Sequence, residues 1–181
     1  MNEKNEYIID TTLDDYFTRS NSKCKYLIMH SLLTSLLESD FESFCVLLND
    51  NKEFINNSDV NGCTLLHFCV KNSKIKETKL LFHYGVDVFC YDNFGYSPIH
   101  YITLIKDKIK INNMLNIFNK NINYKTTNGN TLLHLAVCDE NYYLINEIIK
   151  RNGNMNIKNH NDMKPIDYNS NNNTITCLLN D

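Results

Sequence analysis

The heptapeptide Asn61-Gly62-Cys63-Thr64-Leu65-Leu66-His67 occurs again, in altered form, at residues 94–100 (Phe-Gly-Tyr-Ser-Pro-Ile-His) and 128–134 (Asn-Gly-Asn-Thr-Leu-Leu-His). The histidines that end the three copies, at positions 67, 100 and 134, are 33 and 34 residues apart. A degraded fourth copy at residues 162–167 ends in aspartate, another 33 residues along. A motif that returns at a fixed period of this length indicates stacked copies of one supersecondary unit.

A second apolar pattern recurs in phase with the heptapeptide. Paired apolar residues followed by an Asn- or Asp-containing segment occur over residues 80–88, 114–123 and 148–156, and residues 47–55 carry a related pattern one period earlier. A unit therefore also precedes residue 61, and the repeat is at least fourfold. One such unit cannot bury its apolar faces alone, so stability requires about three or more stacked units.

Each heptapeptide carries residues that start a helix. Thr64, Ser97 and Thr131 suit the N-cap position, because their hydroxyls accept backbone N–H groups that the first helical turn leaves unpaired. Pro98 falls at the first helical position, where its missing N–H costs nothing. The glycine two residues before each cap permits the backbone conformation of a tight turn. We therefore predict a short helix directly after each turn.

A second helix is predicted in each unit. Ile75, Thr78, Leu81 and Phe82 lie at offsets 0, 3, 6 and 7, and residues 142–149 repeat those offsets. Apolar residues at this spacing form one face of a helix. That face is expected to pack against the neighbouring units.

The two ends of the chain differ from the middle. Residues 23–48 predict two amphipathic helices without the heptapeptide, as expected of an N-terminal capping unit. Residues 164–168 begin a final helix, and residues 175–179 form a short second one. Residues 1–22 carry little periodicity and are expected to be loose.

A period near 33 with a start like Gly-x-Thr-Pro-Leu-His resembles the ankyrin repeat, over residues 27 to about 180. The resemblance implies an all-α solenoid of helix-turn-helix units joined by short hairpin-like loops. Ser73 and Glu140 stand where the family has glycine after the first helix. The predicted ankyrin-repeat domain covers residues 23–180, with units at about residues 27–59, 60–92, 93–126, 127–159 and 160–180.

Composition excludes several classes of function. The 181 residues contain 18 Lys and Arg against 21 Asp and Glu, for a net charge of −3, so no basic field attracts nucleic acid or an anionic membrane. The first ten residues are acidic and lack the apolar stretch of a signal peptide. Seven scattered cysteines without a Cys-x-x-Cys pair indicate reduced thiols in an intracellular compartment, and we expect a cytoplasmic protein.

The three histidines admit a metal or acid–base interpretation and a structural one. Identical registers place them in successive layers about 10 Å apart, which is too far to share one zinc ion. In the ankyrin family the equivalent imidazole binds the preceding Thr and nearby backbone, and we assign that structural role. Cys63, Cys69, Cys90 and Cys138 have no partner at catalytic spacing, and no phosphate loop or nucleophile elbow is present. We expect no enzyme activity, no cofactor and no metal.

The resemblance implies a protein-binding surface made of hairpin tips and the exposed side of the first helices. The positions that match the family's variable, partner-reading positions are Val60, Asn61, Cys63, Lys71, Asn72, Asn93, Phe94, Tyr96, Leu104, Ile105, Thr127, Asn128, Asn130, Cys138 and Asp139. Phe94 and Tyr96, with Leu104 and Ile105 beside them, either form an apolar hot spot or cover the stack above them. Residues 106–110, in a unit one residue longer than its neighbours, are interpreted as a solvated loop or a partner-contacting loop.

Divergent repeats in an Asn-rich chain most resemble the ankyrin proteins of poxviruses and other large DNA viruses. That resemblance implies a monomer that binds a host signalling protein and modulates innate signalling of the NF-κB type or host range, in the host cytoplasm or nucleus. Many longer poxviral members add a C-terminal F-box-like segment that recruits a ubiquitin ligase, and we expect none here. Two alternatives stay open: a scaffold or adaptor of an AT-rich eukaryote, and the substrate-binding arm of a ubiquitin-ligase adaptor.

Overall fold

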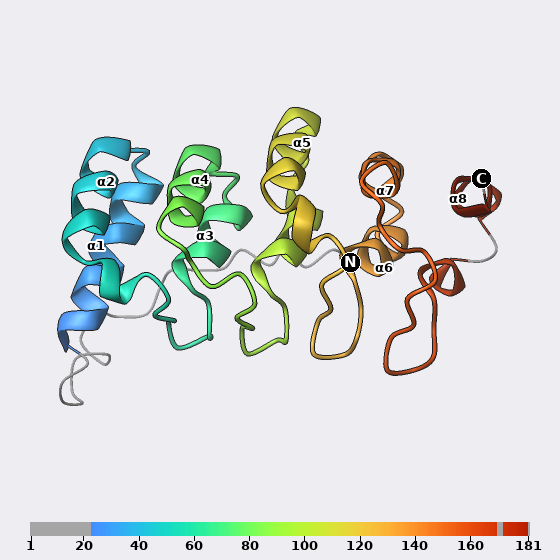
Figure 1. The fold of residues 1–181 in the computed structure, drawn as a ribbon, viewed down its shortest axis with the longest axis horizontal. Helices are drawn as coiled ribbons and strands as arrows, with labels where there is room; N and C mark the ends of the chain where they lie inside the picture. The colour runs from blue at the N-terminus through green and yellow to red at the C-terminus, as the bar shows by residue number, and fades with distance from the viewer. Residues whose placement is uncertain (1–22, 170–171, 181) are drawn as a thin grey trace, which may run out of the picture.

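The computed structural model describes residues 23–169 and 172–180, which form a row of stacked helix pairs with loops projecting from one side (Figure 1). One row of neighbouring helices consists of α1 (Lys23–Leu37), α3 (Leu65–Lys71), η2 (Pro98–Leu104), α6 (Leu132–Cys138) and η4 (Pro165–Tyr168). The second row consists of α2 (Phe41–Asp50), α4 (Ile75–His83), α5 (Lys108–Ile117), α7 (Tyr142–Ile149) and α8 (Asn173–Asn180). The architecture confirms the predicted all-α solenoid. The predicted loose segment 1–22 lies outside the described residues, and the predicted unit boundaries stay a prediction.

The helices of the first row begin as predicted. Thr64, Ser97 and Thr131 are N-caps whose side chains meet the backbone of the first turn, while the histidine three residues later accepts the N–H of the cap residue. The preceding glycines have φ values of 76°, 81° and 81°. These two features together turn the chain sharply from each loop into the stack.

The degraded fourth copy keeps this arrangement with a different side chain. Asp167 Oδ2 accepts the Lys164 N–H at 2.7 Å, which is the bond that the histidine makes in the other units. Pro165 occupies the first helical turn. A carboxylate therefore replaces the imidazole at the cap of η4.

The first helix of the third unit, η2, is a 3-10 helix and not the α-helix found in the units on either side. Ile99, Ile102 and Thr103 are β-branched, which lowers helix propensity. The Thr103 hydroxyl also donates to the His100 carbonyl at 3.1 Å, competing with the backbone for that acceptor. After η2 the chain is extended at Ile105, with φ −76° and ψ 127°.

The prediction of a loop at residues 106–110 was wrong for residues 108–110, which are helical, while residues 106 and 107 lie outside the helices. Asp107 is the N-cap of α5, its side chain accepting the N–H groups of Ile109 and Lys110 at 2.8 and 3.0 Å, and Lys108 begins the helix. The second-row helix begins eight residues after the histidine in all three units, at positions 75, 108 and 142. The additional residue of the third unit therefore lies after α5, where the short helix η3 (Asn119–Asn121) forms.

A residue in the left-handed backbone conformation follows α3 and another follows α6, and neither of them is glycine. Ser73 has φ 56° and Glu140 has φ 52°, at the two positions where the ankyrin family has glycine. Ser39 takes the same conformation, with φ 61°, between α1 and α2. The turn between paired helices is thus kept by geometry even though the residue type has changed.

Apolar side chains from both rows form one continuous core. Leu66 and Val70 of α3, Leu81 of α4 and Ile148 of α7 are fully buried. Phe82 and Phe118 join α4 to the end of α5 with ring centroids 5.0 Å apart and planes at 86°, an edge-to-face contact. Within residues 23–169 and 172–180, no helix has the length and apolar character needed to cross a membrane.

Candidate protein-binding surface

Each projecting loop is a tight hairpin held by the side chain at its first position. Asp59 Oδ1 accepts the N–H groups of Asn61 and Cys63 at 2.9 and 2.8 Å. Asp92 and Asn159 hold the corresponding groups of their own loops at 2.9–3.0 Å, and the Thr126 hydroxyl accepts one, from Asn130, at 3.1 Å. These residues recur at intervals of 33 or 34, so the sequence contained a marker for the loops that we did not use.

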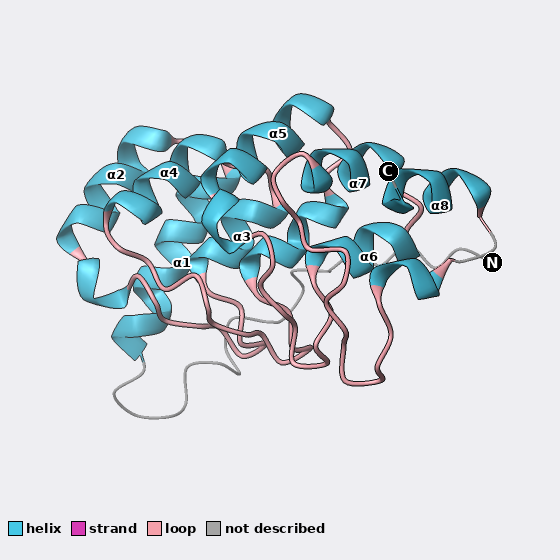
Figure 2. Ribbon diagram, turned by 45° about the vertical axis from the view of Figure 1, so that its right-hand side comes forward, coloured by secondary structure: helices cyan, strands magenta, loops and turns pink. Residues whose placement is uncertain are grey.

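Backbone hydrogen bonds join neighbouring hairpins at their tips. The Asn93 N–H donates to the Asn61 carbonyl at 2.8 Å, the Thr127 N–H to Gly95 at 3.0 Å and the His160 N–H to Asn128 at 3.1 Å. The Asn93 side chain adds a bond to the Val60 carbonyl at 2.9 Å. The loops, side by side in Figure 2, therefore form a continuous and rigid edge along the stack.

The three histidines are structural. In His67, Nδ1 accepts the Thr64 N–H at 3.0 Å and Nε2 meets the Tyr96 carbonyl at 3.1 Å. His100 and His134 bond their own cap residues in the same way, and their Nε2 atoms meet the carbonyls of Tyr124 and Met163 at 3.1 Å. Each ring therefore ties the start of one helix to the following loop, with the proton placed on Nε2 by this network.

Burial is the main cause that lowers the pKa of all three histidines, and it brings the pKa of His100 to about 4 from its ordinary value of 6.5. Their nitrogens face backbone groups that suit the neutral ring. No three His, Cys, Asp or Glu residues come together to hold a metal ion within the part of the chain that the structure describes. The geometry assigns the imidazoles to the stack, and the expected absence of a metal stays a prediction.

The free energy of unfolding is expected to fall as the pH drops from 6.5 towards 4. The folded pKa of His100 lies below its unfolded value, so the unfolded state binds more protons in this window, and the stability that is complete above pH 6.5 is lost on the way to pH 4. The slope from His100 alone approaches about 1.4 kcal/mol per pH unit, and His67 and His134 add to it. Urea denaturation at pH 7, 6 and 5 measures the slope, and a flat or rising stability over this range contradicts the prediction.

Three cysteine thiols, those of Cys63, Cys69 and Cys90, lie in surroundings that disfavour a nucleophilic thiolate. Burial raises the pKa of Cys63 to about 12, and burial also raises the pKa of Cys69, which is fully buried, and of Cys90. Thiols with such pKa values stay protonated at neutral pH, and the thiolate is the reactive form. Cys138 is exposed, at the end of α6. Cys69 is fully buried and packs in the core.

The structure leaves most of the predicted binding residues accessible. Phe94, Leu104 and Val60 are 57%, 52% and 48% exposed, respectively. Five polar members are also exposed: Asn61, Asn72, Asn93, Asn128 and Asp139. Partial burial raises the pKa of the Asp139 carboxyl, and the positive charge of Lys106 lowers it by a smaller amount. Lys71 and Cys63 are half-buried, and Thr127 and Cys138 are exposed.

Three residues of the predicted binding surface are taken up wholly or partly by packing within the stack: Ile105, Tyr96 and Asn130. Ile105 is only 4% exposed and belongs to the core, because its apolar side chain points into the stack where η2 ends. The Tyr96 ring is 37% exposed and packs edge-on against His100 and Tyr101, with centroids 6.2 Å away. Asn130 Oδ1 accepts bonds from Asn159 at 2.7 Å and from Tyr168 at 3.1 Å, which commits this side chain to the stack.

Two tyrosines that were not predicted as site residues form hydrogen bonds with the first residues of the hairpins. The Tyr101 hydroxyl donates to Asp92 Oδ2, and the Tyr168 hydroxyl accepts from Asn159 at 2.9 Å. Both tyrosines follow their cap residue by four positions and lie nine residues after the loop residue that they contact. They hold the anchor side chains of the second and fourth hairpins.

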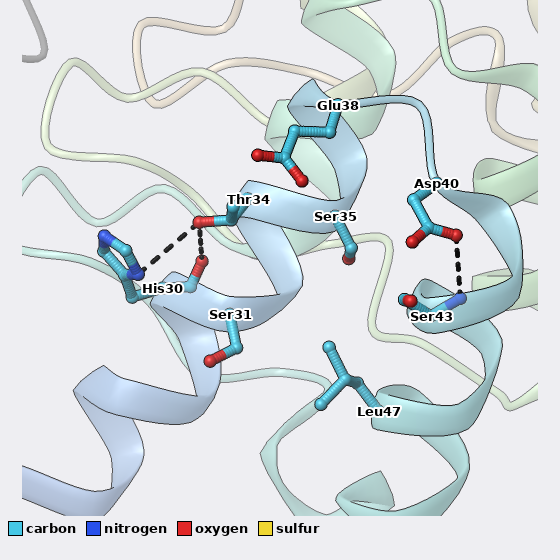
Figure 3. Close-up of a pocket in the computed structure, with 8 residues that line it drawn as sticks. All are labelled: His30, Ser31, Thr34, Ser35, Glu38, Asp40, Ser43 and Leu47. Carbon is cyan, nitrogen blue, oxygen red and sulfur yellow. Dashed lines mark hydrogen bonds between the residues drawn. The ribbon is translucent and has the colours of Figure 1, made fainter.

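A shallow hollow of about 330 Å³ lies between α1 and α2 (Figure 3). Its polar groups mainly serve the helices themselves. The Thr34 hydroxyl donates to the His30 carbonyl at 2.9 Å, and Asp40 Oδ1 accepts the Ser43 N–H at 3.0 Å. Hydrogen bonding to Ser43 holds the pKa of Asp40 below its ordinary value. The Ser31, Thr34 and Ser35 hydroxyls that line the hollow are therefore used within α1.

Stacked helix pairs, hydrogen-bonded hairpins and a capping histidine in each of the three central units define an ankyrin-repeat protein, and the chain belongs to that family. The family model described as Ankyrin repeat matches residues 128–160. Ankyrin repeats mediate protein–protein binding and are in general not enzymes.

Comparison with curated proteins shows that the chain is similar to poxvirus proteins. It is similar to the Ankyrin repeat protein OPG189 of variola virus (isolate Human/India/Ind3/1967), with 32% identity over 136 residues that cover 70% of this chain. A protein of the same name from variola virus matches to the same extent. The matched region is 24% of the relatives' length, so the chain corresponds to about a quarter of each.

Proposed function

We propose that this chain is a viral ankyrin protein that binds a host signalling protein and modulates innate signalling of the NF-κB type or host range. The proposal places it in the host cytoplasm, with the nucleus as a second location, as a monomer without cofactor. Similarity to a poxvirus ankyrin protein supports the viral setting. The binding surface is the edge formed by the first two hairpin tips and the end of η2.

The observation that carries the proposal is the exposure of two apolar side chains, Val60 and Phe94, at the tips of the first two hairpins. Val60 and Phe94 lie on adjacent hairpins that the Asn93 side chain joins through its bond to the Val60 carbonyl at 2.9 Å. Phe94 is 57% exposed, on backbone that is fixed by Asp92. A rigid, exposed aromatic ring buries much area on binding while few rotatable bonds are frozen.

Phe94→Ala is expected to remove binding without loss of stability. The wild-type chain and the variants Phe94→Ala and Val46→Ala would each be used to capture proteins from a vertebrate cell lysate. The captured proteins would be probed for NF-κB subunits. Val46 is 61% exposed on α2 and serves as the matched control. We expect Phe94→Ala to lower the captured amount by about tenfold or more, as for a hot-spot residue, and Val46→Ala to leave it unchanged.

Thermal denaturation of the same variants separates binding from packing. The expected result is an unchanged midpoint for Phe94→Ala, whereas Tyr96→Ala lowers the midpoint because its ring packs on His100 and Tyr101. Full capture by Phe94→Ala would exclude this edge as the binding surface. Capture of no innate-signalling protein by the wild-type chain would contradict the proposed partner and favour a scaffold function.

A further inference from the structure

Three aromatic rings gather away from the hairpin tips, on the segments that lead from α4 and from η3 to the next turns. Tyr124 contacts Phe89 with ring centroids 4.7 Å apart, and it stacks on Tyr91 at 5.7 Å with planes at 16°. Phe89 is 50% exposed and Tyr91 is 39% exposed, while Tyr124 is half-buried between its two partners. The cluster therefore spans two units and leaves two of its rings, Phe89 and Tyr91, partly exposed to solvent.

Hydrogen bonds hold these rings in place. The Tyr91 hydroxyl donates to the Lys125 carbonyl at 3.0 Å, and the Tyr124 hydroxyl donates to the Phe89 carbonyl at 3.1 Å. The Tyr124 carbonyl in turn faces Nε2 of His100, at 3.1 Å. Because both hydroxyl protons are used within the protein, what the cluster offers to a ligand is ring faces on a fixed frame.

A carboxylate lies beside the cluster. Asp87 Oδ1 accepts the Phe89 N–H at 2.8 Å, and Asp87 itself is exposed. The pKa of the Tyr124 phenol is raised mainly by burial, and to a smaller extent by Tyr91 and by the negative charge of Asp87. The nearby Lys125 directs its ammonium group to the Lys158 carbonyl, at 3.1 Å. Negative charge and ring faces, which both attract cations, thus occur together.

We propose that Phe89, Tyr91, Tyr124 and Asp87 form a second binding site, which takes a cationic side chain of a basic peptide segment. An arginine guanidinium stacks on an exposed ring face while its charge is balanced by Asp87. An acidic or purely apolar peptide would not use the carboxylate. The site goes beyond the proposed edge at Phe94, and it works independently of the host protein bound there.

The test is a titration of the full chain with the peptide acetyl-Gly-Arg-Gly-Arg-Gly-amide, followed by NMR of the aromatic resonances. We expect saturable shifts of the Phe89, Tyr91 and Tyr124 rings. The same peptide with citrulline has the shape of arginine without its charge and is expected to bind at least about threefold more weakly. Equal binding of the citrulline peptide, or shifts that avoid these rings, would overturn the proposal.

Asp87→Asn is the variant that tests the carboxylate with least disturbance, because the amide oxygen can still accept the Phe89 N–H. It is expected to weaken the arginine peptide by about two- to fivefold, in the range of an exposed ion pair, with an unchanged thermal midpoint. Phe89→Ala is expected to weaken it by a similar factor. Val46→Ala, at an exposed position on α2, is the matched control and should bind normally. Undiminished binding by both Asp87→Asn and Phe89→Ala would also overturn the proposal.

Discussion

Gly129→Ala is expected to lower the free energy of unfolding by about 2 to 5 kcal/mol. The φ of Gly129 is +81°, a conformation that costs a residue with Cβ about 1–2 kcal/mol. An added Cβ would also lie 2.8 Å from the His160 backbone nitrogen and 3.0 Å from the Asn159 Cα. Backbone atoms cannot rotate away, so the overpacking adds about 1–3 kcal/mol. Urea denaturation of the purified variant measures the loss.

Gly85→Ala separates the two causes. Gly85 has φ +73°, close to that of Gly129, but no atom lies within 4 Å of the position of an added Cβ. We expect this variant to lose only the conformational part, about 1–2 kcal/mol. An equal loss in both variants would show that the contact between the third and fourth hairpins contributes nothing, and that backbone conformation alone selects glycine.

The fold was predictable because its main determinants are local and repeat. Thr64, Ser97 and Thr131 cap their helices wherever the heptapeptide occurs, so one interpretation served several units at once. The 3-10 form of η2 was not predictable from the period. It depends on β-branched residues and on a side-chain bond from Thr103 to the His100 carbonyl, which a pattern of apolar spacing does not contain.

The candidate surface was less predictable, because exposure depends on how a particular turn is built. Leu104 and Ile105 are adjacent and both apolar, yet Leu104 is 52% exposed and Ile105 is 4% exposed. The difference arises where η2 ends and the chain becomes extended. The cluster around Tyr124 escaped the sequence analysis for a related reason. Its rings come from segments about 33 residues apart, at positions where the neighbouring units carry unlike residues.

Phe118→Ala is expected to lower the free energy of unfolding by about 3 to 5 kcal/mol, the range for a fully buried phenylalanine. Phe118 is 0% exposed and meets Phe82 edge-to-face across the α4–α5 contact. In a solenoid each unit contacts only its neighbours, so the interface terms connect the two halves of the stack. Weakening a central interface is therefore expected to split unfolding into two steps, detected as a broadened urea transition.

Phe44→Ala tests whether position in the stack matters. Phe44 is also 0% exposed, but it lies on α2 in the first unit, and its loss removes a comparable apolar volume at the end of the row. Hydrogen exchange measured by mass spectrometry should then rise mainly in α1 and α2, whereas Phe118→Ala should raise it in both α4 and α5. Uniform exchange along the chain in both variants would mean that the stack unfolds as one cooperative unit, against the nearest-neighbour description.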